Sequence, residues 1–350
     1  MILITGSAGF IGSNFTKYFL SKSKEAITSY DKLTYAGDLI NFSSIKEKDL
    51  HSFIEGDISD EKKLNKILSE LKPRAIINFA AETHVDKSIQ APEIFFKTNV
   101  MGTFSLLTST VEYWRKLKKT EKENFRFLHV STDEVYGSLD KHQDAFTEEN
   151  SFKPNSPYSA SKASSDHIVR SFNKTYGLPT LTSNCSNNYG PYQYPEKIIP
   201  LTIINLLNGK KIPIYGDGKQ IRDWLYVKDH CRALLKILDQ GKVGEIYNVG
   251  GRNQIKNIDL VELICNLLEN FGAGKSNNLK NLIDHVKDRP GHDTRYEINT
   301  SKISNDLGWQ PKETFETGMT KTVSWYLDNY EWIEKILDSG YSKWIKKHYK

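Results

Sequence analysis

The sequence predicts an α/β protein with a doubly wound parallel sheet, followed by a smaller C-terminal α/β domain. Short apolar runs alternate with helical patterns through the N-terminal half, and polar motifs follow directly after several of these runs. Strand–helix alternation at this pace is typical of a parallel sheet with helices on both faces. The chain has 350 residues and 38% hydrophobic content, which is enough for one large domain or two closely joined ones.

The expected strands and helices follow one another at short intervals. Strands are predicted at 2–4, 26–30, 51–54, 75–79 and 125–130, and helices at 11–20 and 61–71. After about residue 186, turns and short helices replace this alternation. We therefore expect a first domain over residues 1–186, with returns to its sheet near 224–250, and a second domain over 187–350.

Composition and charge exclude several classes of function. The net charge is +5, but the 48 Lys and Arg residues are interspersed with 43 Asp and Glu residues, so we expect no nucleic-acid partner. No apolar run approaches the ~18 residues of a membrane-spanning helix, and the N-terminus has no signal-peptide pattern. Cys185, Cys231 and Cys265 form neither a metal-ligand pattern nor a disulfide framework. We expect a cytoplasmic protein without a membrane partner or a bound metal.

A glycine-rich turn predicts a dinucleotide site. Gly6, Gly9 and Gly12 follow the first strand and open the first helix, where a tight turn lets the backbone approach a pyrophosphate. Asp31 ends the second strand, and a carboxylate there accepts hydrogen bonds from ribose hydroxyls and repels a 2′-phosphate. The pattern is typical of a Rossmann-type domain and favours NAD over NADP, although Lys32, directly after Asp31, leaves NADP open.

Two further motifs carry acid–base side chains. Tyr158 and Lys162 lie four residues apart on a predicted helix, so we expect the ammonium to lower the pKa of the phenol and make it a usable base. Thr132, Asp133 and Glu134 follow the strand predicted at 125–130, and the ends of parallel strands point towards the ligand crevice. Each motif taken alone also fits an ordinary helix surface or a solvated loop.

Together the motifs resemble the extended short-chain dehydrogenase/reductase superfamily. The run from Thr132 to Glu134 is similar to the nucleotide-sugar 4,6-dehydratases of that superfamily. Five irregular runs resemble the dTDP-glucose 4,6-dehydratase family, at residues 184–192, 195–200, 220–224, 288–292 and 308–309. The resemblance extends from the N-terminus to about residue 326, and it departs from the family pattern at Ser7 and Thr83, where Gly and Ser are expected.

The resemblance implies dehydration of dTDP-glucose to dTDP-4-keto-6-deoxyglucose. Tyr158, assisted by Lys162, would remove the 4-hydroxyl proton as hydride leaves C4 for NAD⁺. Glu134 would take the C5 proton, Asp133 would protonate the departing 6-hydroxyl, and hydride would return to C6. Thr132 would hydrogen-bond the 4-oxygen. Adjacent acids with opposite tasks need separated pKa values.

The resemblance also implies which residues contact the two ligands. The implied cofactor contacts are Gly6, Gly9, Phe10, Ile11, Gly12, Asp31, Lys32, Leu33, Thr34, Asp57, Ile58, Phe79, Ala80, Ala81, Thr98, Tyr158, Lys162 and Asn188. The implied substrate contacts are Thr83, Thr132, Asn187, Lys197, Ile198, Pro213, Ile214, Tyr215, Arg222, Asn257, Asp288, Arg289, Pro290, Gly291 and His292. Lys and Arg in this set suit a diphosphate, and Tyr215 is expected to stack on the base. Asp57 fits a plain surface position nearly as well.

A homodimer is implied by the same resemblance. The superfamily pairs through a four-helix bundle, here from helices near Thr98–Leu117 and Tyr158–Tyr176. The residues expected in its seam are Phe104, Leu107, Val111 and Trp114. The alternative is that these side chains face only their own sheet.

Three other functions stay open. A nucleotide-sugar 4-epimerase would share the fold, NAD and the Tyr158/Lys162 pair, but it does not need Asp133 and Glu134. A UDP-glucose 4,6-dehydratase would share the chemistry, and the run at residues 185–189 favours the dTDP enzymes. A non-catalytic, NAD-sensing regulatory protein would not need the acid–base residues, all of which are present.

Overall fold

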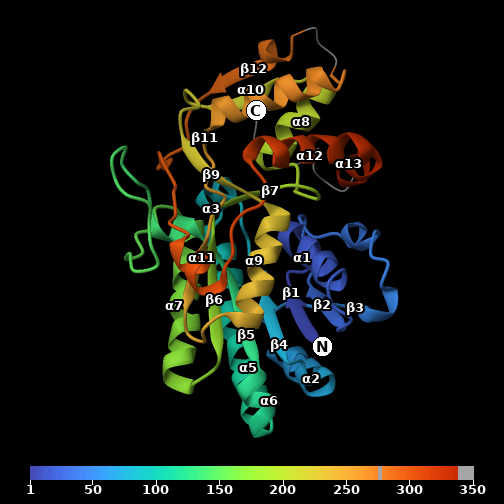
Figure 1. The fold of residues 1–350 in the computed structure, drawn as a ribbon, viewed down its shortest axis with the longest axis vertical. Helices are drawn as coiled ribbons and strands as arrows, with labels where there is room; N and C mark the ends of the chain where they lie inside the picture. Colours follow the sequence, from blue (N-terminus) through green and yellow to red (C-terminus); the bar gives the residue numbers. More distant parts are fainter. Residues whose placement is uncertain (275–277, 338–350) are drawn as a thin grey trace.

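A parallel sheet of seven strands forms the centre of the larger part of the molecule, within residues 1–274 and 278–337, which the computed structural model describes (Figure 1). Its order is β10-β6-β5-β4-β1-β2-β3, and every pairing is parallel. The strands are β1 (Ile2–Thr5), β2 (Ile27–Asp31), β3 (His51–Glu55), β4 (Ala75–Asn78), β5 (Arg126–Thr132), β6 (Thr180–Cys185) and β10 (Ile246–Val249). The predicted doubly wound fold is confirmed, with its switch point between β1 and β4.

Helices cover both faces of this sheet. They are α1 (Phe10–Leu20), α2 (Glu61–Leu71), α5 (Thr103–Lys116), α7 (Pro157–Tyr176), α9 (Val227–Gln240) and α11 (Ser301–Leu307). Ile2 and Ile4 pack on one face with side chains of α1 and α9, and Leu3 packs on the other face with α2, α5 and α7. Because β1 and β4 are buried on both faces, they are mostly apolar along their length.

The smaller part, at the top of Figure 1, carries two short sheets covered by helices. In its described residues the sheet orders are β11-β9-β7 and β12-β8. The strands are β7 (Asn187–Tyr189), β8 (Ile212–Tyr215), β9 (Ile221–Tyr226), β11 (Gln254–Lys256) and β12 (Ile283–Val286), and the helices are α8 (Ile198–Leu207), α10 (Asn257–Asn270), α12 (Phe315–Asp328) and α13 (Tyr330–Ile336). Ile204, Leu260 and Val323 contribute to its separate core.

Short helical segments fill the connections. The α-helical and π-helical ones are α3 (Val85–Gln90), α4 (Pro92–Phe95), η3 (Phe96–Gly102) and α6 (Lys119–Asn124). The 3-10 segments are η1 (Leu39–Phe42), η2 (Lys48–Leu50), η4 (Asp133–Tyr136) and η5 (Leu279–Leu282). Residues of α3, η3 and η4 line the cavities described below.

The chain crosses between the two parts more than once. Strand β9 lies in a small sheet, whereas the helix that follows it, α9, packs on the main sheet. Strand β10 then pairs in parallel with β6 at the edge of the main sheet. Residues 338–350, which belong to the predicted second domain, lie outside the described residues.

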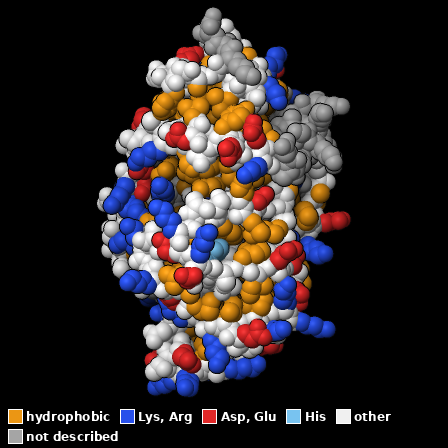
Figure 2. All heavy atoms as spheres, turned by 90° about the vertical axis from the view of Figure 1, so that its right-hand side faces the viewer, with side chains coloured by type: hydrophobic (Ala, Val, Ile, Leu, Met, Phe, Trp, Pro, Cys, Tyr) orange, Lys and Arg blue, Asp and Glu red, His pale blue; other side chains and the backbone are white. Residues whose placement is uncertain are grey.

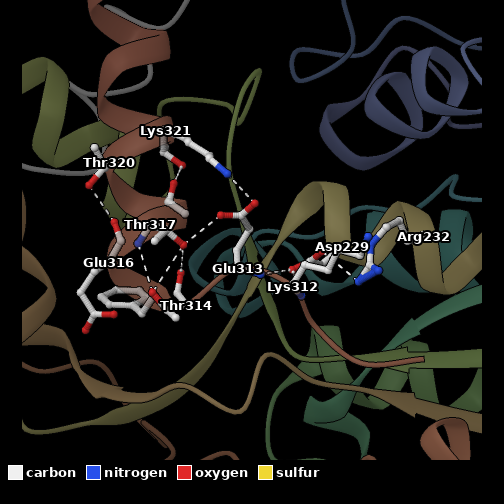
Figure 3. Close-up of polar contacts among 12 residues, drawn as sticks. Asp229, Arg232, Lys312, Glu313, Thr314, Glu316, Thr317, Thr320 and Lys321 are labelled. Atoms are coloured by element: carbon white, nitrogen blue, oxygen red, sulfur yellow. Dashed lines mark hydrogen bonds and ion pairs between the residues drawn. The ribbon is translucent and has the colours of Figure 1, made fainter. Parts of the chain in front are cut away.

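Asp229, on the first turn of α9, ties the two parts together (Figure 3). Its carboxylate accepts hydrogen bonds from the backbone N–H groups of Lys312 at 2.8 Å and Glu313 at 2.9 Å, and from Arg232 Nε at 3.1 Å. Thr314 follows directly and caps the N-terminus of α12. Because Asp229 is buried, these hydrogen bonds fix where the chain enters α12 relative to α9.

Two residues of the expected dimer seam are buried inside their own chain, so that part of the prediction is wrong. Leu107 and Val111 belong to the core between the sheet and α2, because residues four apart share one helix face. Trp114 packs against the same core. By contrast, Phe104 is 40% exposed and Met101, in the preceding turn, is 55% exposed.

The surface carries charges of both signs. Figure 2 shows Lys and Arg interspersed with Asp and Glu over the face on the right-hand side of Figure 1, without a field of one sign. Among residues 1–274 and 278–337, no helix is long and apolar enough to cross a membrane, and no cluster of His, Cys, Asp and Glu could hold a metal ion. The three cysteines are buried and free.

Candidate active site

A cavity of about 270 Å³ lies at the carboxyl ends of β1, β2, β4 and β5, at the switch point of the sheet. We call it the glycine-turn cavity. The predicted residues that line it are Gly6, Gly9, Phe10, Ile11, Gly12, Asp31, Lys32, Thr34, Ile58, Phe79, Ala80, Ala81, Thr83, Thr98, Thr132, Asp133, Glu134, Tyr158, Lys162, Asn187, Asn188 and Lys197. Leu33 and Asp57 are not among the residues that line it.

The turn between β1 and α1 has no room for side chains at two of its glycines. Gly6 has a φ of 65°, and a Cβ there would lie 2.4 Å from the backbone nitrogen of Ala80. A Cβ on Gly12 would lie 2.4 Å from the carbonyl oxygen of Gly6. The chain can therefore turn tightly from β1 into α1, whose first residues line the cavity. The N–H groups of a helix N-terminus are suited to bind a phosphate.

Asp31 holds the loop beside this turn. Its Oδ2 accepts a hydrogen bond from the backbone N–H of Ala8, and its Oδ1 accepts one from Leu33, both at 2.9 Å. Burial raises the pKa of Asp31, and these two hydrogen bonds oppose the shift. Lys32 Nζ lies 3.6 Å from Asp57 Oδ2. Asp57 therefore pairs with Lys32 beside the cavity.

Lys162 and Tyr158 both line the cavity from α7, but the hydrogen bonds of Lys162 run towards the sheet. Its Nζ donates to the carbonyl oxygen of Val130 at 2.9 Å and lies 3.4 Å from His129 Nε2. Burial lowers the pKa of Lys162, and the carboxylate of Asp166 opposes this shift. The Lys162 side chain is thus held against β5 by a backbone carbonyl and a buried histidine.

The pKa of Tyr158 differs from the expectation of a lowered value. Burial raises this pKa well above its ordinary value, and the nearby Glu134 carboxylate raises it further. A hydrogen bond with the Thr132 side chain opposes the shift. In this structure the phenol is therefore protonated at neutral pH, because burial and a like charge outweigh the groups that favour the phenolate.

The two neighbouring acids, Asp133 and Glu134, have different electrostatic surroundings. Burial raises the pKa of Asp133 well above its ordinary value, and the carboxylates of Glu134 and Asp223 add to this shift. Burial also raises the pKa of Glu134, but Arg222 and Lys197 oppose it. Both pKa values are raised, that of Asp133 more strongly, so Asp133 holds its proton more tightly than Glu134 does. This is the order that a general acid beside a general base requires.

A second cavity of about 190 Å³ adjoins the first, and its lining includes the cations Lys197, Arg222 and Arg289 as well as several carboxylates. We call it the basic cleft. The predicted residues that line it are Thr83, Glu134, Asn187, Asn188, Lys197, Ile198, Pro213, Ile214, Tyr215, Arg222, Asn257, Arg289, Gly291 and His292. Asp288 and Pro290 do not line it, but Asp288 Oδ1 lies 2.6 Å from His292 Nδ1 and so orients that ring.

Several polar groups of the cleft are already paired with one another. Arg289 forms an ion pair of 3.1 Å with Asp86, and its guanidinium lies 4.5 Å from the centre of the Tyr215 ring. Tyr215 donates a hydrogen bond to Asp86 at 3.3 Å. The guanidinium of Arg222 lies over the Tyr296 ring at 4.3 Å. One face of Tyr215, where we expected a base, therefore meets Arg289 in this structure.

Residues that line both cavities connect them. Glu134, Asn187, Asn188 and Lys197 were predicted for one role or another, whereas Glu196 was not. Asn187 Oδ1 is buried and has no hydrogen-bond partner among the described residues, so it can accept a donor from a ligand.

Sequence reasoning also missed other cleft residues, among them Asp86, Asp293 and Tyr296. Asp86 lies three residues after the predicted Thr83, and Glu196 lies within the 195–200 run, so closeness to these predicted positions was the available signal. Tyr296 and Asp293 carry no local signal beyond their position shortly after residues 288–292.

The sequence and fold match known proteins over nearly their whole length. The GDP-mannose 4,6 dehydratase family model matches residues 3–322. The dTDP-glucose 4,6-dehydratase of Salmonella typhimurium is 50% identical, covering 99% of this chain and 98% of that protein. The chain belongs to the dTDP-glucose 4,6-dehydratase family.

Solved structures of this family agree with the fold. The dTDP-glucose 4,6-dehydratase of Bacillus anthracis, in complex with NAD, has a TM-score of 0.84 and 47% identity, with 96% of this chain and 99% of that chain covered. The Streptomyces venezuelae enzyme, with NAD and TYD bound, has a TM-score of 0.87 and 41% identity over the same shares. Both cavities lie within the aligned extent of the family model, since their lining residues fall between 6 and 296.

Proposed function

We propose that this chain catalyses the NAD-dependent dehydration of dTDP-glucose to dTDP-4-keto-6-deoxyglucose. The observation that carries the proposal is that the predicted acid–base residues lie where the two cavities adjoin. Thr132, Asp133, Glu134, Tyr158 and Lys162 line the glycine-turn cavity, and Glu134 also lines the basic cleft. Family relatives with this activity, about 50% identical over the full chain, support it.

The glycine-turn cavity fits NAD. Gly6 lets the turn pack against Ala80, where a side chain would collide, so the start of α1 can face a pyrophosphate in the cavity. Asp31 offers a carboxylate to a ribose. When bound there, NAD supplies a hydride acceptor for C4 and a hydride donor for C6. The sugar nucleotide is placed in the basic cleft, where Lys197, Arg222 and Arg289 suit its diphosphate.

The chain's own residues divide the proton transfers. Tyr158 accepts the proton of the 4-hydroxyl as the phenolate, and because burial and Glu134 favour the protonated phenol, the positive charges of Lys162 and bound NAD⁺ must first lower its pKa. Thr132 hydrogen-bonds the 4-oxygen as charge develops on it. The 4-ketone acidifies C5, and Glu134 takes that proton. Asp133, kept protonated by burial and by the charge of Glu134, donates a proton to the departing 6-hydroxyl.

A labelling experiment tests this function. The chain is incubated with dTDP-glucose that carries deuterium at C4, and the 4-keto product is followed by its absorbance in alkali. We expect a product labelled at C6, because the same hydride is returned after water is lost. A 4-epimerase would return the label to C4 with the 6-hydroxyl intact, and that result would refute the proposal. UDP-glucose as a parallel substrate tests the choice of nucleotide.

The domain roles follow the same division. Residues 1–186, with α9 and β10, are proposed to bind NAD, and the remainder of the chain from residue 187 is proposed to bind the nucleotide sugar. We also propose that the protein is cytoplasmic, which its three free cysteines support.

A homodimer is part of the proposal. Exposed apolar side chains gather on α4, η3, α5 and the end of α7, and they are Ile94, Phe96, Met101, Phe104 and Tyr176. A pair of chains that packed α5 and α7 together would cover this surface. Sedimentation at micromolar concentration should give twice the mass of the 40.1 kDa chain; a monomer would contradict it.

A further inference from the structure

A hydrogen-bonded bridge links the C-terminal helix α13 to the glycine turn. Trp332 Nε1 donates to Asn41 Oδ1 at 2.9 Å, across 291 residues of sequence. Asn41 Nδ2 in turn donates to the carbonyl oxygen of Ala8 at 2.8 Å. Asn41 is 2% exposed, so water does not replace either partner. Figure 1 shows α13 near α1 and the loop after β2.

The same end of the chain also holds the loop at residues 188–194. Tyr192, in this loop, has a φ of 68°, and its ring lies 4.5 Å from that of Trp325 and 5.9 Å from that of Trp332. Tyr326 donates to the carbonyl oxygen of Gln193 at 2.7 Å. A left-handed non-glycine residue persists only where its surroundings hold it, and here α12 and α13 provide those surroundings.

The two held segments meet across the glycine-turn cavity. Ala36 and Gly37 of the first segment and Asn188 and Gln193 of the second all line it. At their meeting point the rings of Tyr35 and Tyr194 are 5.5 Å apart. The Tyr35 hydroxyl also donates to Glu196 Oε1 at 3.1 Å. These contacts must separate for the two segments to open.

We propose that Trp332 and Asn41 form a clamp that slows the release of NAD from the glycine-turn cavity. Both are positioning residues, because they act through the Ala8 turn and the cavity walls. The purpose of the clamp rests on the proposed function, in which the cofactor reduced at C4 must remain until it reduces C6. A cofactor that escaped between these steps would leave the reaction unfinished.

The clamp predicts that loss of the Trp332 indole N–H group alone speeds the release of NAD. Trp332→Phe keeps an aromatic ring in the cluster but leaves Asn41 Oδ1 buried without its donor. A buried acceptor without a partner is costly, so the closed arrangement is weakened and NAD should leave about tenfold faster. Trp325→Phe is the matched control, since Trp325 packs against the same rings but does not donate to Asn41.

The experiment measures NAD release from the full chain without any sugar nucleotide. Each variant is loaded with NAD and diluted into a trap for free nucleotide, and the NAD that remains bound is measured over time. We expect Trp332→Phe and Asn41→Ala to release NAD at similar, raised rates, and the double variant to be no faster than Asn41→Ala alone. Trp325→Phe should release NAD at the rate of the unaltered chain, and dTDP binding by calorimetry should be unchanged in all variants.

Two results would overturn the clamp. One is a rate of release from Trp332→Phe equal to that of the unaltered chain. The other is an equal increase in Trp325→Phe, which would show that packing alone is responsible. The proposed function has a separate test: an unaltered chain that retains NAD but makes no 4-keto product refutes the dehydratase and leaves the clamp standing.

Discussion

The two cavities of the candidate site are built in different ways. The glycine-turn cavity takes most of its walls from the ends of neighbouring strands and from the start of α1, so many wall residues follow a strand closely in the sequence. The basic cleft gathers side chains from distant segments, among them Asp86, Lys197, Arg222 and Arg289. A parallel sheet therefore prepares the first cavity, whereas the second exists only after the chain has crossed the molecule several times.

Glu134 is where this difference matters for the chemistry. It follows β5, as a wall residue of the first cavity should, yet it also lines the basic cleft. Cations of the cleft, Arg222 and Lys197, oppose the rise of its pKa that burial causes. The cleft thus does more than bind a diphosphate, because its charge also favours the ionised form of a base in the neighbouring cavity.

The largest expected effect comes from removing that shared base. Glu134→Gln keeps the shape of the side chain but cannot take the C5 proton. We expect loss of water to slow by roughly 10²–10⁴, while oxidation at C4 survives and a 4-keto-glucose nucleotide accumulates in rapid-quench samples. Glu93→Gln, an exposed glutamate on α4, is the control. Equal slowing of both steps in Glu134→Gln would show that the two cavities do not divide the reaction.

An effect of the same order is expected at the first cavity. Tyr158→Phe removes the acceptor of the 4-hydroxyl proton, so oxidation at C4 should slow by roughly 10²–10⁴ in a single turnover. No intermediate should accumulate, since the first step becomes limiting. Tyr176→Phe, at the exposed end of the same helix, should behave as the unaltered chain does. A build-up of the 4-keto-glucose nucleotide in Tyr158→Phe would contradict this assignment.

What the sequence could predict also differs between local features, such as the main sheet, and contacts between distant segments. The main sheet could be predicted from the apolar runs and from the glycines at 6, 9 and 12, because these patterns are local in the sequence. The strands expected near 51–54 and 75–79 are present as β3 and β4. Leu107 and Val111 were misjudged, since helical periodicity defines an apolar face without saying which surface covers it.

The rest depended on contacts between distant segments. The pairing of Arg289 with Asp86, across 203 residues, has no local signal, so the face of Tyr215 that it occupies could not be foreseen. The contacts of Lys162 with Val130 and His129 could not be predicted either. The spacing of four residues shows that Lys162 and Tyr158 are neighbours on a helix, but not which partner each side chain contacts. Motif resemblance located many cleft residues but did not supply their contacts.

A smaller effect is expected on the pH dependence of elimination. Arg222 lowers the pKa of Glu134 against the effect of burial, and elimination is lost as pH falls through that pKa, because only the carboxylate is a base. Arg222→Gln should therefore move the acidic limb of the rate at saturating substrate to higher pH. Lys219→Gln, an exposed lysine paired with Asp217, should leave the limb in place. If Arg222→Gln weakens substrate binding without moving the acidic limb, the charge of Arg222 does not influence the pKa of Glu134.

The smallest effect is expected at Asp229, the junction between the two parts of the molecule. Asp229→Asn retains one side-chain oxygen but loses the charge that serves two backbone N–H groups and Arg232. We expect the free energy of unfolding, measured by denaturant titration, to fall by about 1–3 kcal/mol, because a buried hydrogen-bonded group is left poorly matched. Glu313→Gln removes a half-exposed ion pair to Lys321 and should cost less than about 1 kcal/mol. Because Asp229 contacts neither cavity, dTDP binding and the rate of C4 oxidation should change by less than a few fold in the folded variant. A loss of elimination with normal C4 oxidation would mean that the junction sets the position of Glu134 against the cleft, and that the two cavities are less independent than their separate construction suggests.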